Sequence, residues 1–119
     1  MKLAALASAV LVATATTASA QEIGGKYRVA GTNLNGSRYA GTAEIVATGG
    51  ATCRIAWTTG GTTAKGLCMR QGGTLAAAYV MSGAIGLIVY QIKPDGVLDG
   101  VWTIADQAGS GTDVLTPMP

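Results

Sequence analysis

Few side chains in this chain can carry chemistry, and the residue type that most often does so is missing. None of the 119 residues is a histidine, so the usual general base at neutral pH and the commonest metal ligand are both lacking. Serine offers no nucleophile motif, because Ser37, Ser82 and Ser110 stand beside glycines without a G-x-S-x-G elbow or a partner base. The sequence therefore predicts no catalytic residue and no enzyme activity.

Six acidic residues remain as candidates for acid catalysis or cation binding. Asp95 and Asp99 flank one expected turn, and Asp106 and Asp113 bracket the last polar loop. Glycoside hydrolysis needs two opposed carboxyl groups in a cleft, whereas aspartates near turns usually shape the turn. The loop from Asp106 to Asp113 leaves a weak calcium site as an open alternative, although it lacks EF-hand spacing. We expect no metal and no cofactor.

The two cysteines, Cys53 and Cys68, are spaced for a structural disulfide rather than for redox chemistry. They do not form a C-x-x-C motif, and a metal site would need further ligands. Residues 52–58 and 63–68 alternate around Gly60-Gly61 and predict a hairpin. A register symmetric about these glycines places Cys53 opposite Cys68, where Cα atoms lie roughly 4.5 to 5.5 Å apart, within disulfide reach.

Aromatic residues are the other candidates for a site. The chain has two tryptophans, four tyrosines and no phenylalanine. They either fill a core or surround a ligand, and the many Gly, Ala and Thr residues leave little bulk to fill a barrel. A barrel of this composition is either flattened or encloses a cavity. The candidate pocket residues are Trp57, Trp102, Tyr27, Tyr39 and Tyr90.

The elements that would position these residues are short strands between regularly placed glycines. Val, Ile, Thr, Tyr and Trp alternate with small or polar residues, and no stretch keeps a helical period. We predict strands at 25–31, 38–47, 52–58, 63–68, 74–81, 84–92, 97–104 and 112–116. The connections are too short for parallel crossovers. The fold class is therefore all-β, a single-domain antiparallel meander closed as an eight-stranded up-and-down barrel, with a flattened β-sandwich as the alternative.

The N-terminus reads as a secretory signal peptide. Lys2 precedes an apolar run from Leu3 to Ala13, and small residues end in Ala18-Ser19-Ala20. We expect cleavage after Ala20, giving a signal peptide at 1–20 and one β domain at 21–119 in the periplasm or secreted. The apolar run is shorter than the roughly 20 residues that span a bilayer, so we expect no membrane anchor.

Charge excludes one class of partner. The chain has eight Lys or Arg and six Asp or Glu, a formal net charge of +2, and Lys2 belongs to the leader. Nucleic-acid binding needs clustered basic residues, so we expect no such partner. The first three expected strands carry four basic residues at exposed positions, Lys26, Arg28, Arg38 and Arg54. These residues either form a basic strip or are ordinary alternating charges on a solvent-exposed face.

Two resemblances follow from particular segments. Residues 95–102, with the Gly-x-Tyr start at 25–27, resemble hairpins of the avidin-like barrels, which implies a barrel architecture. More of the chain, including residues 57–60 and 66–70, resembles small secreted bacterial β-rich proteins, some of which are labelled fibronectin-binding. That label implies adhesion to a host or matrix protein.

The leading functional hypothesis is a non-enzymatic exported binding module. Its partner is a small ligand inside the barrel or a protein on its surface, and neither is identified by the sequence. The alternatives are a fibronectin-binding-like adhesion protein or a small protease or lysozyme inhibitor, which would use a protruding segment such as residues 21–24.

Overall fold

A computed structural model describes residues 22–119 of the chain. The predicted signal peptide, residues 1–20, lies outside the described residues, as does Gln21. The described part forms eight strands, β1 (Gly25–Thr32), β2 (Arg38–Ala47), β3 (Thr52–Thr59), β4 (Thr62–Gln71), β5 (Thr74–Met81), β6 (Ala84–Ile92), β7 (Leu98–Ile104) and β8 (Gly111–Pro117).

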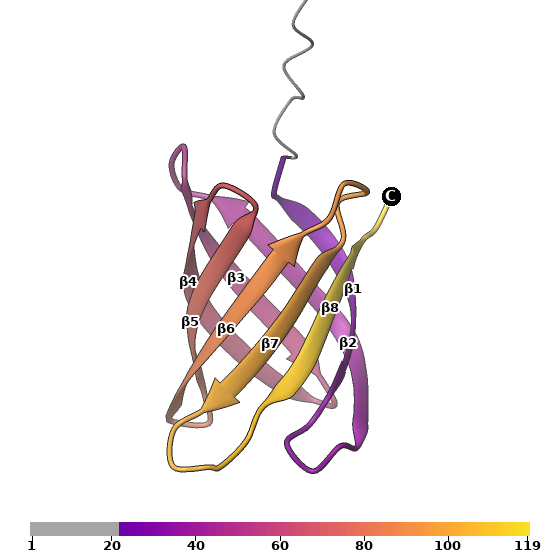
Figure 1. Ribbon diagram of the computed structural model, residues 1–119, viewed down its shortest axis with the longest axis vertical. Helices are drawn as coiled ribbons and strands as arrows, with labels where there is room; N and C mark the ends of the chain where they lie inside the picture. The colour runs from indigo at the N-terminus through magenta and orange to yellow at the C-terminus, as the bar shows by residue number, and fades with distance from the viewer. Residues whose placement is uncertain (1–21) are drawn as a thin grey trace, which may run out of the picture.

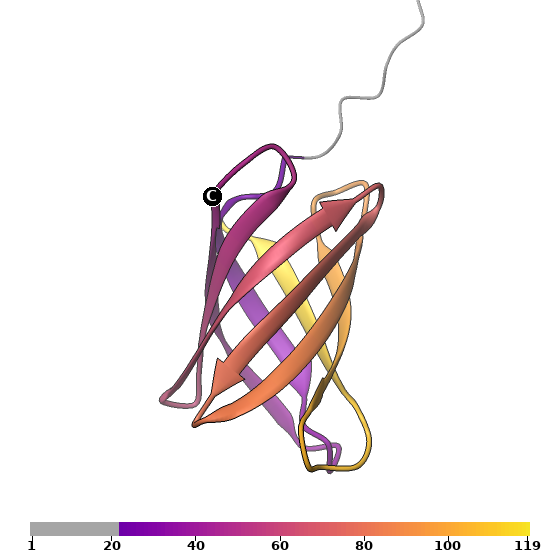
Figure 2. The ribbon, with the colours of Figure 1, turned by 90° about the vertical axis from the view of Figure 1, so that its left-hand side faces the viewer.

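The strands form one closed antiparallel barrel in which each strand pairs with the next along the chain. β1 also pairs with β8, from Tyr27 opposite Pro117 to Thr32 opposite Thr112, so the sheet formed by residues 22–119 has no free edge. Figures 1 and 2 show the strands tilted across the barrel, with connections at both ends. The predicted up-and-down barrel is confirmed, and the flattened sandwich is not formed.

The β3–β4 hairpin is longer than the sequence pattern predicts. Gly60 and Gly61 both have positive φ, 55° and 78°, as a two-residue turn matched to strand twist requires. Pairing therefore continues up to Thr59 opposite Thr62. At the other end of β4 the ladder extends to Gln71 opposite Thr74, because the short β4–β5 turn keeps both strands in register.

The disulfide joins the two residues that the hairpin register predicts. Cys53 lies directly opposite Cys68 in the ladder, their Cα atoms are 4.9 Å apart, and the sulfurs are bonded. Both side chains face the barrel interior and are buried. The prediction of a structural cross-strand disulfide is confirmed.

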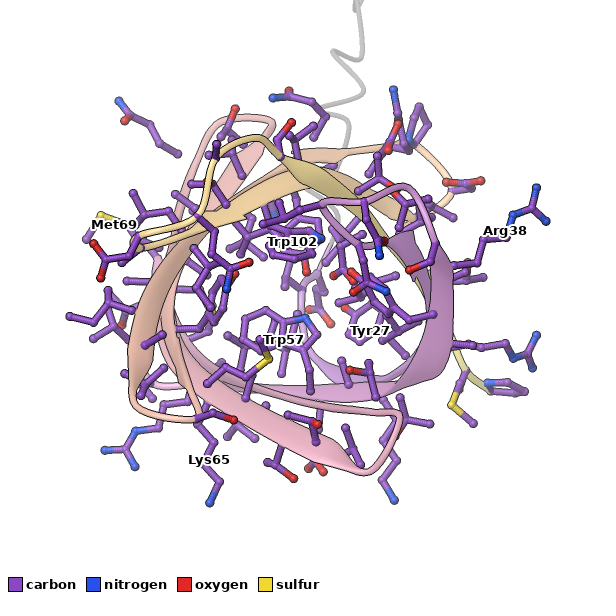
Figure 3. All side chains as sticks on the ribbon, turned by 90° about the horizontal axis from the view of Figure 1, so that it is seen from below. Tyr27, Arg38, Trp57, Lys65, Met69 and Trp102 are labelled. Carbon is purple, nitrogen blue, oxygen red and sulfur yellow. A yellow bond between two sulfur atoms is a disulfide. The ribbon has the colours of Figure 1, made fainter. Side chains whose placement is uncertain are left out.

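Alternation along the strands sends one set of side chains into the barrel and the other outward. The interior is built mainly from aliphatic residues, tyrosines, one tryptophan and the cystine, the largest fully buried members including Ile45, Ile55, Leu75, Tyr90 and Leu115. Figure 3 looks along the barrel and shows Trp57, Tyr27 and Trp102 inside the wall, with Arg38, Lys65 and Met69 pointing outward.

The two ends of the barrel differ in what they carry. The chain enters β1 and leaves β8 at one end, together with the β2–β3, β4–β5 and β6–β7 connections (Figure 1). The opposite end carries the remaining four connections, including the longer β7–β8 loop. Within the described residues, no helix is long and apolar enough to cross a membrane.

Candidate ligand-binding cavity

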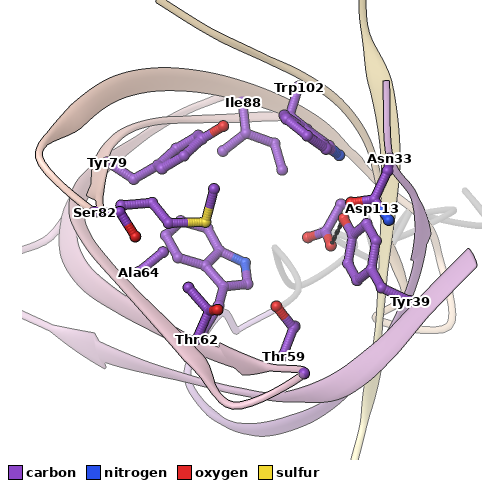
Figure 4. A pocket seen from close by; sticks show the side chains of 13 residues that line it. Asn33, Tyr39, Thr59, Thr62, Ala64, Tyr79, Ser82, Ile88, Trp102 and Asp113 are labelled. Carbon is purple, nitrogen blue, oxygen red and sulfur yellow. Dashed lines mark hydrogen bonds between the residues drawn. The ribbon is translucent and has the colours of Figure 1, made fainter. Parts of the chain in front are cut away.

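The end of the barrel away from the termini contains a cavity of about 360 Å³, within the size range of small-molecule sites. Its rim includes Asn33 from the β1–β2 connection, Gly60 from the β3–β4 turn and Ser82 from the β5–β6 turn. Figure 4 shows side chains from opposite walls converging on this space. The predicted shortage of bulky filling residues therefore results in a cavity that opens at the end of the barrel rather than in collapsed walls.

Aromatic rings form much of the cavity wall. Trp57 and Tyr79 make an edge-to-face pair with ring centroids 5.5 Å apart and planes at 65°. Tyr39 and Trp102 form a second pair, at 6.4 Å and 67°. Ile88, Met81 and Ala64 add aliphatic surface to the lining (Figure 4). A ligand here meets mainly aromatic and aliphatic surface.

Glycines allow these rings to lie against the wall instead of filling the cavity. Tyr79 is opposite Gly86 in the β5–β6 ladder, and a Cβ atom built at Gly86 would overlap the Tyr79 ring. The same cross-strand arrangement recurs in the pairs Tyr39–Gly31, Tyr90–Gly100 and Trp102–Gly111. Packing of an aromatic ring over a cross-strand glycine is a known means of covering a gap in a sheet.

The polar atoms of these rings are already bonded within the protein. Tyr79 donates its hydroxyl proton to the Thr103 carbonyl at 2.9 Å, and Trp102 Nε1 donates to the Thr112 carbonyl at 3.2 Å. Among the described residues, no buried side-chain nitrogen or oxygen is without a hydrogen-bond partner. These hydrogen bonds therefore hold the Tyr79 and Trp102 rings against the barrel wall, and the surface that the cavity presents is mainly apolar.

A buried hydrogen-bond network lies at one side of the cavity. Trp57 Nε1 donates to the Tyr90 hydroxyl at 3.0 Å, and Tyr90 donates in turn to Asp113 Oδ2. Tyr39 donates to Asp113 Oδ1 at 2.6 Å. Asp113 is 1% exposed and is the one charged or polar residue that is buried in the described chain.

Burial in this apolar interior raises the pKa of Asp113 above its ordinary value, although hydrogen bonds from Tyr39, Tyr90 and Trp57 oppose the rise. The hydrogen-bond geometry also accommodates the protonated acid. The Tyr39 hydroxyl has one proton but lies within bonding distance of both Asp113 Oδ1 and the Thr112 carbonyl, which is 2.8 Å away. A protonated Asp113 can donate to Tyr39, which leaves Tyr39 free to donate to Thr112.

The tyrosines of this network are donors rather than bases. Burial and the nearby Asp113 raise the pKa of Tyr79 to about 12. Burial, again with Asp113, raises the pKa values of Tyr39 and Tyr90 further. All three phenols therefore stay protonated at neutral pH. Tyr39 and Tyr90 hold Asp113 in place, whereas Tyr79 bonds to the Thr103 carbonyl, and none of the three acts as a base.

Of the five predicted pocket residues, the structure brings three to the cavity. Trp57, Trp102 and Tyr39 line it. Tyr90 is fully buried and contributes through its hydrogen bonds. Tyr27 lies away from the cavity, and its hydroxyl contacts the backbone of Gly24 near the start of the described chain.

The candidate residues that the sequence analysis missed are Tyr79 and Asp113, both of which line the cavity. Asp113 belongs to β8 and points inward instead of bracketing the loop with Asp106, which is exposed. The two therefore do not share a calcium site. Across residues 22–119, no group of three or more His, Cys, Asp or Glu is placed to hold a metal ion.

A second hollow of about 430 Å³ lies at the end of the barrel that carries the termini. It is bordered by Glu22, Arg70, Cys53 and the 49–52 connection, and none of its lining residues is aromatic. This hollow lacks the aromatic walls and the buried hydrogen-bond network, so the aromatic cavity is the better candidate site.

Neither a protein family nor a curated protein matches this sequence. Solved structures do match its fold. A redesigned β barrel, mFAP1, bound to DFHBI, aligns with a TM-score of 0.68 and 18% identity over 79% of this chain and 94% of that chain. Another redesigned β barrel gives 0.71 at 16% identity, over 81% of this chain and 91% of that chain. At these identities, the protein is similar in fold to small designed β barrels, one of which binds a small ligand.

Proposed function

We propose that this protein is a non-enzymatic, exported binding module that holds a small ligand in the aromatic cavity. The observation that carries the proposal is the cavity of about 360 Å³ between Trp57, Tyr79 and Trp102. Aromatic residues that line a cavity and are fixed by their own hydrogen bonds make a preformed, mainly apolar site. The small-ligand complex of mFAP1, a barrel of similar fold, supports the same use of the interior.

The lining indicates what kind of ligand fits. Asp113 lines the cavity but is buried, which raises its pKa and favours its uncharged form, and both of its carboxyl oxygens already have partners, so it offers a ligand no exposed charge. Thr59, Thr62 and Ser82 place hydroxyl groups near the rim. The site therefore suits an uncharged, flat, mainly apolar molecule whose polar end points toward the mouth of the barrel.

Export rests on the predicted signal peptide and on the buried disulfide, since disulfides persist mainly in oxidising compartments. A carrier in the periplasm or outside the cell needs no catalytic group, in keeping with the residue inventory. The proposal therefore assigns binding to the cavity and stability to the cystine.

The test is native mass spectrometry of the protein isolated from the cells that produce it. A retained molecule should add to the mass of the chain, and its removal should change the emission of Trp57 and Trp102, the two tryptophans of the chain. A bare chain whose tryptophan emission is also unaffected by an apolar extract of those cells would contradict the proposal.

A matched pair of variants locates the binding. Thr62 lines the cavity, whereas its neighbour Thr63 on β4 faces solvent. Thr62→Phe should obstruct the cavity and weaken retention of the ligand, and Thr63→Phe should leave it unchanged. Equal effects of the two changes would place binding elsewhere.

A further inference from the structure

The β5–β6 turn holds a serine in a backbone conformation that normally belongs to glycine. Met81 is paired with Ala84 in the ladder, so the turn consists of Ser82 and Gly83, whose φ angles are 50° and 79°. A two-residue turn with positive φ at both positions is usually built from Gly, Asn or Asp. The left-handed conformation costs a serine free energy that it does not cost a glycine. Backbone chemistry alone therefore favours glycine at position 82.

The β3–β4 turn, which borders the same cavity, has glycine at the equivalent position. Thr59 is paired with Thr62, and between them Gly60 and Gly61 have φ angles of 55° and 78°, nearly those of the β5–β6 turn. Gly60 and Ser82 both line the cavity. The two turns thus share a backbone shape and a location. What Ser82 adds is its hydroxyl group.

The Ser82 hydroxyl has no partner that would explain it within the protein. Among residues 22–119 it makes no hydrogen bond, either to the backbone of its own turn or to a neighbouring side chain. A serine that stabilises a turn uses its hydroxyl for such a bond. The residue is only partly exposed and lines the cavity (Figure 4). Because its oxygen is nevertheless accessible, it can bond to a molecule that enters there.

Thr62 places a second hydroxyl on the same side of the cavity as that of Ser82. Ala64 is opposite Met81 in the β4–β5 ladder, so Thr62 and Ser82 lie just beyond this pair, at the ends of adjacent strands (Figure 4). The Thr62 hydroxyl likewise makes no hydrogen bond within the described part of the chain. Each hydroxyl can donate one bond and accept others. A ligand hydroxyl matches such a pair, because it can accept from one and donate to the other.

We propose that Ser82 determines the ligand specificity of the cavity by binding, together with Thr62, a hydroxyl group of the ligand. The inference rests on the proposed function and narrows it to one chemical class, an uncharged alcohol or phenol with a flat apolar body. The body lies between Trp57, Tyr79 and Trp102, whose polar hydrogens already have partners within the protein. The ligand hydroxyl stays at the mouth. The strained backbone of Ser82 thus has a functional reason, as strained residues at binding sites often have.

The test compares naphthalene with 2-naphthol, two flat probes that differ by one hydroxyl group. Titrations at neutral pH are followed through the indole N–H signals of Trp57 and Trp102 in proton–nitrogen NMR spectra. Wild type should bind both probes and bind 2-naphthol more tightly. Ser82→Ala and Ser82→Gly should each raise the dissociation constant of 2-naphthol roughly 3- to 10-fold, the effect of one neutral hydrogen bond. Neither change should alter the dissociation constant of naphthalene, which has no group for Ser82 to bind.

Urea unfolding distinguishes the role of the hydroxyl from that of the strained backbone. Ser82→Gly should unfold at a higher urea concentration than wild type, because glycine adopts positive φ freely, whereas Ser82→Ala should not. Asp106→Gly is the matched control. Asp106 is the other non-glycine residue with positive φ (65°) in the described chain, and it is exposed and outside the cavity. Its replacement should also raise the urea midpoint but leave both dissociation constants unchanged.

The outcomes separate this inference from the proposed function. Unchanged binding of 2-naphthol by both Ser82 variants would overturn the inference and leave a cavity that binds naphthalene. Equal weakening of both probes would also overturn it, because Ser82 would then shape the mouth without recognising the hydroxyl group. Failure of wild type to bind either probe would contradict the proposed function, and the inference would fall with it.

Discussion

The ring of Tyr79 covers Gly86, the residue directly opposite it in the β5–β6 ladder. This contact explains how a barrel with several large aromatic residues keeps an open interior. A ring that lies over a glycine stays against the wall, whereas a side chain at position 86 would push it toward the lumen. The spacing of glycines thus controls the volume of the cavity as well as the turns.

Gly86→Ala is therefore expected to destabilise the protein by about 1–3 kcal/mol, because the added methyl group forces the Tyr79 ring out of its place. It should also strain the 2.9 Å hydrogen bond to Thr103. Urea unfolding measures the loss. Gly73→Ala is the control, since a Cβ atom there meets nothing within 4 Å, and it should be neutral. Equal stability of the two variants would show that Tyr79 adapts without cost.

The state of Asp113 determines how stability depends on pH. Burial raises its pKa in the folded protein above the unfolded value of about 3.9. The folded state therefore holds the proton more tightly. The contribution of Asp113 to the free energy of unfolding is therefore highest at pH values below its pKa in the unfolded chain. This contribution falls as pH rises from that value to the raised pKa of Asp113 in the folded protein.

Asp113→Asn should remove this contribution. The amide can donate to the Tyr39 oxygen and accept from Tyr90, as a protonated carboxyl group does. The variant should be close to wild type at low pH and gain stability relative to it as pH rises. Denaturant melts across pH measure the difference, with exposed Asp99→Asn as control. A large loss of stability in Asp113→Asn at every pH would show that the ionised carboxylate is the form the network needs.

The disulfide should contribute about 3 kcal/mol, the loop-closure value for about 15 residues, since Cys53 and Cys68 are 15 apart in sequence. A double Cys53→Ala, Cys68→Ala variant is expected to unfold at correspondingly lower urea concentration while keeping its β-type circular dichroism. Wild type unfolded and refolded under reducing conditions should match the variant. An unchanged midpoint would mean that hairpin pairing alone fixes this part of the barrel.

The barrel itself was predictable because its signals are local. Alternation assigned Tyr27 and Val29 to one face of β1, and the Gly60-Gly61 turn fixed the register that pairs Cys53 with Cys68. The apolar outer surface of β6 was also visible in the sequence pattern. Ile85, Leu87 and Val89 are apolar at the outward positions of β6, between inward residues such as Ile88.

The site was less predictable because it depends on the stagger of the strands around the closed barrel. Tyr79 and Tyr90 both point inward from neighbouring strands, yet only Tyr79 reaches the described cavity. The partners of Asp113 are likewise distant, with Tyr39 74 residues away and Tyr90 23. One local signal was present: in β8, Asp113 occupies an inward position between Gly111 and Leu115.

The two tryptophans should differ in their contribution to stability even though both line the cavity. Trp57 is 6% exposed and donates to the buried Tyr90 hydroxyl at 3.0 Å. Trp102 is partly exposed and donates to a backbone carbonyl at 3.2 Å. Loss of a buried partner costs about 1–3 kcal/mol, and the smaller phenylalanine ring adds a cavity cost.

Trp57→Phe should therefore destabilise the protein more than Trp102→Phe, by at least about 1 kcal/mol in urea unfolding. The change should also weaken the support of Asp113, because Trp57, Tyr90 and Asp113 form one hydrogen-bonded chain. A double variant of Trp57→Phe and Asp113→Asn tests this point. If these residues act as a unit, the two changes in the free energy of unfolding will not add. Additive changes, or a larger effect of Trp102→Phe, would show that the network does not act as a unit.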